Sequence, residues 1–377
     1  MIKFGALIAC LLIILLTAVV SRIPLSIVDT YRGPQEHWPK PTIDEGVDFK
    51  LLGALPKEAR FPEHNPYTKA KETLGRQLFF DRRMSQSEQV SCASCHDPDL
   101  GWADGKRKAI GHNRLRHDLN TPSIINSAWL DSVYWNGRAG SLEAQIIETW
   151  KNPLEMAAHL PKAVARIISI EGYHPMFQDA FGTEEISALH ISKAIATFMR
   201  KVTLTNTKFD KFMRGERAAL KNDEIEGLHL FRTKARCANC HNGNLLSDGK
   251  FHHLGSSFHN VGEFQGRYRV TKLAENVGAF RTPGLRGFAE TSPYLHNGFI
   301  KDLDTLLNLY NNGWWQNSEL ENKGNNIPTA TLSKHIKTLD LSKQERMQLK
   351  AFLGTLKAFL GTLKGQAFWI EPPTELE

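Results

Sequence analysis

The chain contains the pattern Cys-x-x-Cys-His twice, and the two copies use four of its five cysteines. This pattern is typical of covalent attachment of a c-type haem. The two cysteines form thioether bonds with the haem, and the histidine that follows binds the iron as its proximal ligand. The predicted haem-binding residues are Cys92, Cys95 and His96 in the first copy, and Cys237, Cys240 and His241 in the second.

Two other uses of paired cysteines fit less well. A zinc site needs four ligands at one place, whereas each of these pairs is followed directly by its own histidine. A small disulfide scaffold is excluded by the length of 377 residues. Haem therefore remains the better interpretation for both copies, and a chain with two haems is suited to moving electrons in pairs.

Composition excludes a nucleic-acid partner. The formal net charge of +7 is mild, and the sequence has no basic run or basic–aromatic cluster. The length is sufficient for two domains with separate cores.

The N-terminus predicts export. Residues 1–21 contain Lys3 and then an uncharged apolar run from Phe4 to Val20, which is typical of a signal peptide or a signal anchor. The cleavage signal at Val19-x-Ser21 is weak, which favours an uncleaved anchor. Covalent haem attachment in bacteria takes place outside the cytoplasmic membrane, so we expect a periplasmic protein attached to the inner membrane if the segment is retained. Residues 22–66 contain seven prolines and predict a tether or an extended wrap over the surface.

The remainder predicts a mainly α fold with long polar loops. Helices are expected at 70–81, 142–150, 161–171, 186–198 and 222–231, from apolar spacing and capping residues. The segments that lead to the two haem motifs resemble each other weakly, which suggests two cytochrome c-like haem domains. Their predicted bounds are 67–212 and 213–377.

The C-terminal helix is expected to begin with a capping box at Ser342 and Glu345. It then contains the same seven residues twice, at 351–357 and 358–364. Because seven residues are close to two helical turns, we expect this duplication to lengthen the helix.

Several motifs around the haem sites resemble those of bacterial di-haem cytochrome c peroxidases and the related MauG proteins. The resemblance covers roughly 74–363, and its motifs occur in the family's order. The motifs are Leu-Gly-Arg-Gln-Leu-Phe-Phe-Asp at 74–81, Trp-Asn-Gly-Arg at 135–138, Asn-Pro-Leu-Glu-Met at 152–156, Phe-Arg-Thr-Pro at 280–283 and Pro-Tyr-Leu-His-Asn-Gly at 293–298.

This resemblance implies catalytic roles around the first haem. Glu155 matches the family's catalytic glutamate, and Gln145, ten residues earlier, matches its pocket glutamine. A carboxylate in this place moves a proton between the two oxygens of peroxide. Trp135 matches the tryptophan that relays electrons between the haems. The family often has a proline where this chain has Thr149, which suggests a wetter or more mobile pocket.

The resemblance also implies further iron ligands. His112, sixteen residues after His96, matches the removable ligand of the first iron in resting peroxidases, and MauG proteins lack it. Tyr310 stands where most peroxidases have a methionine ligand of the second iron, and tyrosine is the MauG choice. Met347 is the only methionine after the second haem motif, and we expect a core role for it.

A calcium ion between the haems is implied by Asn120, Thr291 and Pro293, which match the family's oxygen ligands. His296 is expected near the second haem without a defined role. Ala235 replaces the surface tryptophan through which MauG oxidises its protein substrate, which argues against that reaction here.

Three functions are therefore weighed. The first is an exported di-haem peroxidase that reduces hydrogen peroxide with electrons from a small c-type cytochrome or copper protein. The second is a MauG-like oxidase that acts on a protein or a small organic molecule, and the third is a di-haem electron carrier. The resemblance leaves a homodimer open.

Overall fold

The computed structural model describes residues 25–257, 265–314 and 327–357. The predicted signal or anchor segment at 1–21 lies outside these residues. The chain divides into two units, residues 1–40 and residues 41–377. In the first unit, helix α2 (Ile27–Arg32) is followed by a short turn, and the Tyr31 and Trp38 rings lie 4.7 Å apart.

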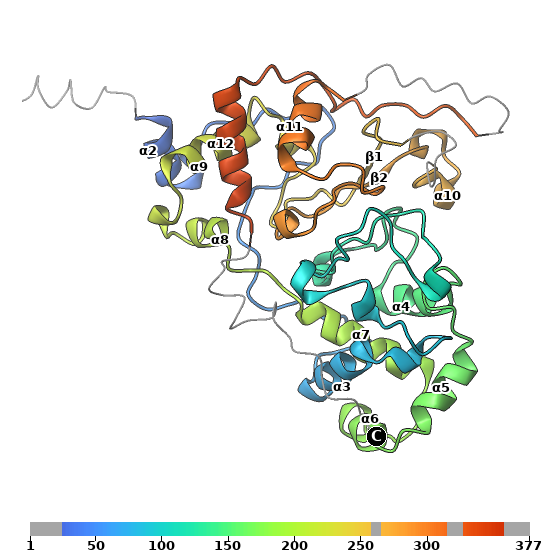
Figure 1. Cartoon of the computed structure of the whole chain (residues 1–377). Helices are drawn as coiled ribbons and strands as arrows, with labels where there is room; N and C mark the ends of the chain where they lie inside the picture. The colour runs from blue at the N-terminus through green and yellow to red at the C-terminus, as the bar shows by residue number, and fades with distance from the viewer. Residues whose placement is uncertain (1–24, 258–264, 315–326, 358–377) are drawn as a thin grey trace, which may run out of the picture. The chain divides into compact units, whose positions relative to one another are not determined.

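The described part of the second unit is mainly helical, as predicted, with one two-stranded sheet (Figure 1). The sheet pairs β1 (Phe251–His252) antiparallel with β2 (Phe280–Arg281). The α-helices are α3 (Lys69–Phe80), α4 (Leu142–Lys151), α5 (Leu160–Ile168), α6 (Tyr173–Phe181), α7 (Ala188–Lys201), α8 (Lys208–Met213), α9 (Asn222–Arg232), α10 (Tyr268–Thr271), α11 (Leu303–Asn311) and α12 (Lys343–Gly354).

The helices predicted from the sequence are confirmed to within a few residues, because most begin at a side chain that caps the first turn. Ser141 accepts a hydrogen bond from the backbone N–H of Ala144 at the start of α4. The capping box of Ser342 and Glu345 is present at the start of α12. Helices α2, α6, α8, α10 and α11 were not among these predicted helices.

The helix that precedes each haem motif crosses a later helix at a glycine. Helix α3 packs on α7 at Gly75, where a Cβ atom would overlap the carbonyl group of Ala194. Helix α9 packs on α12 at Gly227, where a Cβ atom would overlap the carbonyl group of Gln348. Only glycine allows the two backbones to approach this closely.

The same two crossings carry matching aromatic pairs. Phe79 of α3 and Phe198 of α7 have ring centroids 5.1 Å apart at an interplanar angle of 61°. Phe231 of α9 and Phe352 of α12 also lie 5.1 Å apart, at 62°. The weak echo between the two lead-in sequences therefore corresponds to a repeated packing arrangement.

Residues 41–66 have no helix or strand and run along the second unit as an extended segment. Leu52 and Leu55 are buried. Hydrogen bonds hold the segment through Thr42 to Arg232, Lys50 to Gly243, Leu55 to Asp210, and Asn65 to Glu143. Thr42, near its start, is bonded to α9, and Asn65, near its end, is bonded to α4. The segment therefore contacts the surroundings of both haem motifs.

Two expectations about the C-terminal region are wrong. Helix α12 ends at Gly354, within the first copy of the repeat, so the duplication does not lengthen it. A helix-disfavouring glycine followed by Thr355, whose hydroxyl bonds the Phe352 carbonyl, accounts for this end. The second copy lies outside the described residues. Met347 is 57% exposed rather than part of the core.

Within the part of the chain that the structure describes, no helix combines the length and apolar character needed to cross a membrane.

The close helix crossings predict how alanine substitutions at glycine change the free energy of unfolding. An Ala in a helix interior is ordinarily favoured over Gly by about 1 kcal/mol. We expect the opposite at Gly227, where Gly227→Ala should lower the free energy of unfolding by about 1–3 kcal/mol because the added methyl forces α9 away from α12. Urea unfolding of the haem-loaded protein measures this.

Gly354→Ala in α12 is the matched control, because a Cβ atom there meets nothing within 4 Å. It should leave stability unchanged or raise it slightly. Equal effects of the two substitutions would contradict the close crossing.

Candidate functional site

The first haem motif forms a 3-10 turn at Cys92–Ser94, and the backbone N–H of His96 donates to the Cys92 carbonyl at 2.9 Å. The Nδ1 atom of His96 lies 3.0 Å from the carbonyl oxygen of Trp102. This contact places the ring proton on Nδ1 and leaves Nε2 free to bind iron. Burial lowers the pKa of His96, which keeps the imidazole neutral, as a metal ligand must be.

The second motif repeats this geometry. A 3-10 turn spans Cys237–Asn239, and the backbone N–H of His241 donates to the Cys237 carbonyl at 2.8 Å. The Nδ1 atom of His241 lies 3.0 Å from the Leu246 carbonyl oxygen. Burial lowers the pKa of His241 as well. Both motifs therefore present a neutral histidine with one nitrogen available.

The cysteines are suited to thioether formation rather than to zinc or a disulfide. All four are free. Burial raises the pKa of Cys92 and of Cys237 to about 12, so neither is held as a thiolate. Each pair lines its own cavity, so the two pairs do not form one four-cysteine site.

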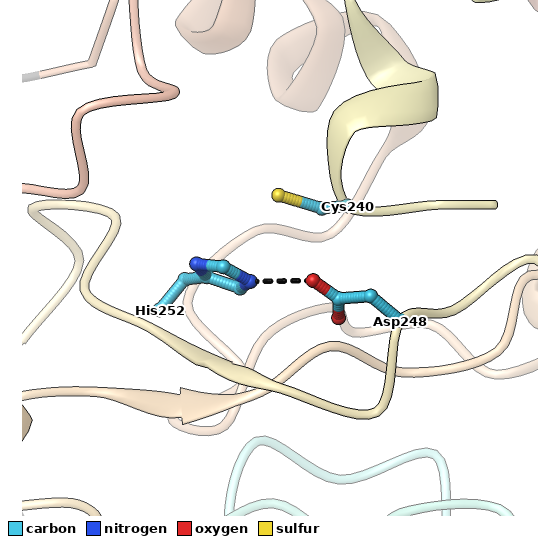
Figure 2. A group of neighbouring side chains, drawn as sticks. All are labelled: Cys240, Asp248 and His252. Carbon is cyan, nitrogen blue, oxygen red and sulfur yellow. Dashed lines mark hydrogen bonds and ion pairs between the residues drawn. The ribbon is translucent and has the colours of Figure 1, made fainter. Parts of the chain in front are cut away.

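A further cluster near the second motif offers potential metal ligands. Cys240, Asp248 and His252 have ligand atoms within 4.8 Å of one another (Figure 2). His252 Nε2 and Asp248 Oδ2 are paired at 2.8 Å, and Cys240 belongs to the haem motif. Three donors, two of them already paired, do not complete a closed zinc site.

The first cavity brings together most of the predicted catalytic residues. It is lined by Cys92, Cys95 and His96, and also by Trp135, Gln145 and Glu155. Apolar side chains such as Phe79, Ile146 and Trp150 cover the remainder of its wall. A buried, mainly apolar cavity with both cysteines and the histidine at its edge fits a covalently bound haem.

Glu155 is mostly buried, and its surroundings favour proton transfer. Burial raises the pKa of its carboxyl group above the usual range. Its Oε2 atom is buried and has no hydrogen-bond partner among the described residues. Its Oε1 atom lies 3.6 Å from Nε2 of His117.

Sequence reasoning missed His117, and the structure does not place His112 in the same position. His117 lines the first cavity, whereas His112 is not among the residues that line it. The backbone N–H of His112 instead donates to the Glu155 carbonyl at 2.8 Å. The only sequence signal for His117 was its place in the same basic loop, five residues later.

Gln145 and Thr149 lie one turn apart on α4, and Gln145 Nε2 donates to Thr149 Oγ1 at 2.9 Å. The hydroxyl of Tyr134 lies 3.0 Å from Thr149 Oγ1. Arg138 lies over the Tyr134 ring at 3.3 Å from its centroid. All of these side chains line the first cavity. Arg138 belongs to the motif at 135–138 quoted from the sequence, whereas Tyr134 and the contacts of Thr149 were not predicted.

The second cavity is lined by Cys237, Cys240 and His241, together with Tyr310 and His296. Tyr310 is at the last turn of α11, and burial raises the pKa of its phenol. Among the described residues, no methionine lines this cavity. Tyr310, which the sequence predicts as a ligand of the second iron, therefore lies on the wall of the cavity that contains the second haem motif.

Trp135 lines both cavities. Its indole N–H donates to the Asn120 carbonyl at 2.8 Å, and its own carbonyl accepts from the backbone N–H of Arg281 at the same distance. The His296 ring lies 6.5 Å from the Trp135 ring and stacks on Phe280 at 3.6 Å. One aromatic side chain, that of Trp135, thus forms part of the wall of both cavities.

The three predicted calcium ligands line the second cavity. The amide nitrogen of Asn120 donates to the Lys106 carbonyl at 2.7 Å, which leaves its amide oxygen as the remaining acceptor. An amide oxygen together with backbone carbonyls is a donor set that suits a hard cation. Ala235, at the position of the MauG surface tryptophan, is buried.

Comparisons with known proteins agree with this geometry. The family model described as di-haem cytochrome c peroxidase matches residues 69–218. The methylamine utilization protein MauG of Methylorubrum extorquens is 38% identical over 303 residues, which cover 80% of this chain and 82% of that protein. A cytochrome-c peroxidase of Denitromonas iodatirespirans, IdrP1, is 32% identical over 338 residues, which cover 82% of this chain and 86% of that protein.

Among solved structures, a MauG-like protein associated with microbial copper homeostasis superposes with a TM-score of 0.74 at 29% identity, covering 85% of this chain and 98% of that one. The repeated haem motifs, their two cavities and these relatives lead to the same assignment. The chain belongs to the family of di-haem cytochrome c peroxidases and MauG proteins, with two haem c groups implied, and it is a peroxidase-type oxidoreductase.

Proposed function

We propose that this protein reduces hydrogen peroxide at the haem bound by His96. Electrons from a small redox protein, a c-type cytochrome or a copper protein, enter at the His241 haem and pass by way of Trp135. The observation that supports this most is the presence of Glu155, Gln145 and Trp135 on one cavity wall beside the first haem motif. A pure electron carrier has no need of a buried carboxyl group there.

The residues of the first cavity supply the proton chemistry. Bound haem would supply the iron that binds peroxide, and the two haems would supply the two electrons that the peroxide takes up. Glu155 would take a proton from one peroxide oxygen and return it to the other, which leaves as water. Gln145 offers an amide to orient the substrate. Two electrons and two protons convert one peroxide to two waters.

The raised pKa of Glu155 is useful for this exchange. A carboxyl group whose pKa lies nearer neutrality is both a better base and a competent acid. Because the unpartnered Oε2 is buried, the atom that handles the proton is shielded from bulk water.

Glu155→Gln should lower peroxide turnover by about 10²–10⁴-fold, because the amide cannot exchange a proton. The measurement is steady-state peroxide reduction with a reduced cytochrome or copper-protein donor. Glu88→Gln, at a mostly exposed ion pair with Arg166, is the control and should keep full activity. Undiminished turnover in Glu155→Gln would instead favour the electron carrier.

His112 is proposed as the removable ligand of the first iron, released when the second haem is reduced and the loop that carries it moves. His112→Ala should then let the fully oxidised protein react with peroxide, which the unmodified protein does only after half reduction. Stopped-flow mixing with peroxide measures both. Rapid reaction of the unmodified oxidised protein would remove this gate.

A MauG-like oxidase is the second candidate, and Tyr310 is the observation that favours it. A tyrosine ligand stabilises the ferric state, whereas methionine favours the ferrous state. The similarity to the Methylorubrum MauG protein supports the same candidate. The buried Ala235 argues against a surface radical site at that position.

Tyr310→Met should raise the reduction potential of the second haem, because a neutral sulfur replaces an anionic oxygen. A spectroelectrochemical titration measures the potential. Tyr294→Phe, which alters another tyrosine on the same cavity wall, is the control and should leave the potential unchanged. The same potential in Tyr310→Met as in the unmodified protein would show that Tyr310 is not a ligand.

The remaining assignments complete the proposal. The haem domains are residues 67–212 and 213–377, and a calcium ion is held by Asn120, Thr291 and Pro293. The protein is exported to the periplasm through residues 1–21, which attach it to the inner membrane if they are retained. Residues 22–66 then serve as the tether or wrap.

A further inference from the structure

We propose that Arg267 is a positioning residue for electron transfer between the two haems. Its side chain holds the segment at 134–138, which carries Trp135, against the sheet of β1 and β2. This inference rests on the proposed role of Trp135 as the relay. Arg267 itself lies outside the family motifs found in the sequence and is not among the residues that line either cavity.

Arg267 bonds the main chain directly after Trp135. Its Nη1 atom donates to the Asn136 carbonyl at 2.9 Å and to the Gly137 carbonyl at 2.7 Å. Hydrogen bonds from a charged donor are stronger than those between neutral groups. Asn136 is buried, so removal of the arginine takes this donor from a carbonyl that water does not freely reach. The two bonds therefore fix the course of the chain after the indole.

The main chain at and before Trp135 is bonded by Arg281 of β2. The backbone N–H of Arg281 donates to the Trp135 carbonyl at 2.8 Å, and its Nε atom donates more weakly to the Tyr134 carbonyl at 3.4 Å. Four successive carbonyl groups, from residue 134 to residue 137, thus accept hydrogen bonds from two arginines that come much later in the chain. Trp135 is held from both sides.

Arg267 is itself fixed at both ends. Its backbone N–H donates to the Ala279 carbonyl at 2.8 Å, just before β2. Gly266 makes this approach possible, because it has a φ of +55° and a Cβ atom there would overlap the Ala279 carbonyl group. At the other end, the guanidinium lies over the Phe251 ring of β1, 4.4 Å from its centroid. The arginine therefore presents its donors from a rigid base.

Gly137 is packed against the same ring and the same guanidinium. It has a φ of +65°, a value that favours glycine, and a Cβ atom there would overlap the Phe251 ring and lie 2.8 Å from Arg267 Nη1. Because no side chain fits between them, the turn, the ring and the guanidinium form one close-packed unit. A change in the arginine is therefore transmitted to the turn that carries Trp135.

The position of Trp135 matters because this side chain lines both cavities. Its indole N–H donates to the Asn120 carbonyl at 2.8 Å, so the ring is anchored at its tip while Arg267 helps to anchor its main chain. A displacement of about 1 Å at a reacting group costs up to about 10²-fold in rate. A looser turn should therefore slow the transfer of each electron that peroxide draws from the His241 haem.

Arg267→Met removes both hydrogen bonds and keeps much of the length of the side chain. When half-reduced protein is mixed with saturating peroxide, stopped-flow absorbance follows the oxidation of the His241 haem, and we expect its rate to fall about tenfold. Amide hydrogen exchange in residues 133–140 should become faster, because the turn has lost two hydrogen bonds. Arg267→Lys keeps a charged donor and should restore most of the rate and of the protection.

Arg217→Met is the matched control. Arg217 also donates to a main-chain carbonyl, that of Phe212 at 3.3 Å, and lies over the ring of the same residue, 5.2 Å from its centroid. Phe212 belongs to α8 and not to the segment at 134–138. This substitution should leave the transfer rate and the exchange in residues 133–140 unchanged. Equal slowing in Arg217→Met and Arg267→Met would overturn the inference.

Phe251→Leu tests the same unit while keeping the arginine, and it carries the test if Arg267→Met does not fold with both haems. It removes the ring on which the guanidinium lies. We expect a smaller loss of transfer rate, about threefold, together with faster exchange in residues 133–140. Where this variant carries the test, an unchanged rate would overturn the inference.

Trp135→Phe separates the inference from the proposed function. It should slow oxidation of the His241 haem at least as much as Arg267→Met does. A slow Trp135→Phe variant beside an Arg267→Met variant with the unmodified rate would overturn the inference and leave the proposed function standing. The unmodified rate in Trp135→Phe would remove the relay from the proposed function, and the inference with it.

Discussion

The close approach of helix backbones at Gly75 and Gly227 is the constraint on which the rest of the second unit depends. Each glycine lies on the helix that leads into a haem motif, and each faces a carbonyl group of a later helix. Aromatic pairs with nearly the same geometry pack beside both crossings. Each haem-binding turn therefore follows a packed pair of helices, α3 with α7 or α9 with α12. Any side chain at these glycines would push apart helices that are distant in sequence.

The two helix pairs lie beside cavities whose lining residues differ in chemistry. Both proximal histidines are partly buried and oriented by a backbone carbonyl, so the difference between the cavities lies in their other lining residues. The first cavity has a buried carboxyl group with hydrogen-bonding neighbours, which suits proton transfer to and from a substrate. The second has Tyr310 and His296 among its lining residues, and within the described residues no carboxyl group lines it. Trp135 lines both, so one side chain is positioned to connect them.

The outcome of prediction depended on whether a feature is local. Helices α3, α4, α9 and α12 were predicted because each begins at an identifiable capping or apolar pattern in its own sequence. Helices α8 and α11 are short, and their formation depends on burial of side chains such as Phe209 and Leu307 against other segments. The end of α12 at Gly354 was missed because the repeated sequence suggested continuation, while Thr355 bonds back to the preceding turn.

The sequence by itself indicated the two haem-binding motifs, the carboxyl and amide groups that line the first cavity, and the family that the chain resembles, because these follow from residue types at short, regular spacings. Only the tertiary structure decided that His117 rather than His112 lines the cavity, that Trp135 borders both cavities, and that the Thr149 hydroxyl accepts from the Gln145 amide. The physical reason is competition for partners. A side chain takes the direction that its neighbours leave open, and the Gln145 carbonyl is available to Thr149 or not according to where Tyr134 lies.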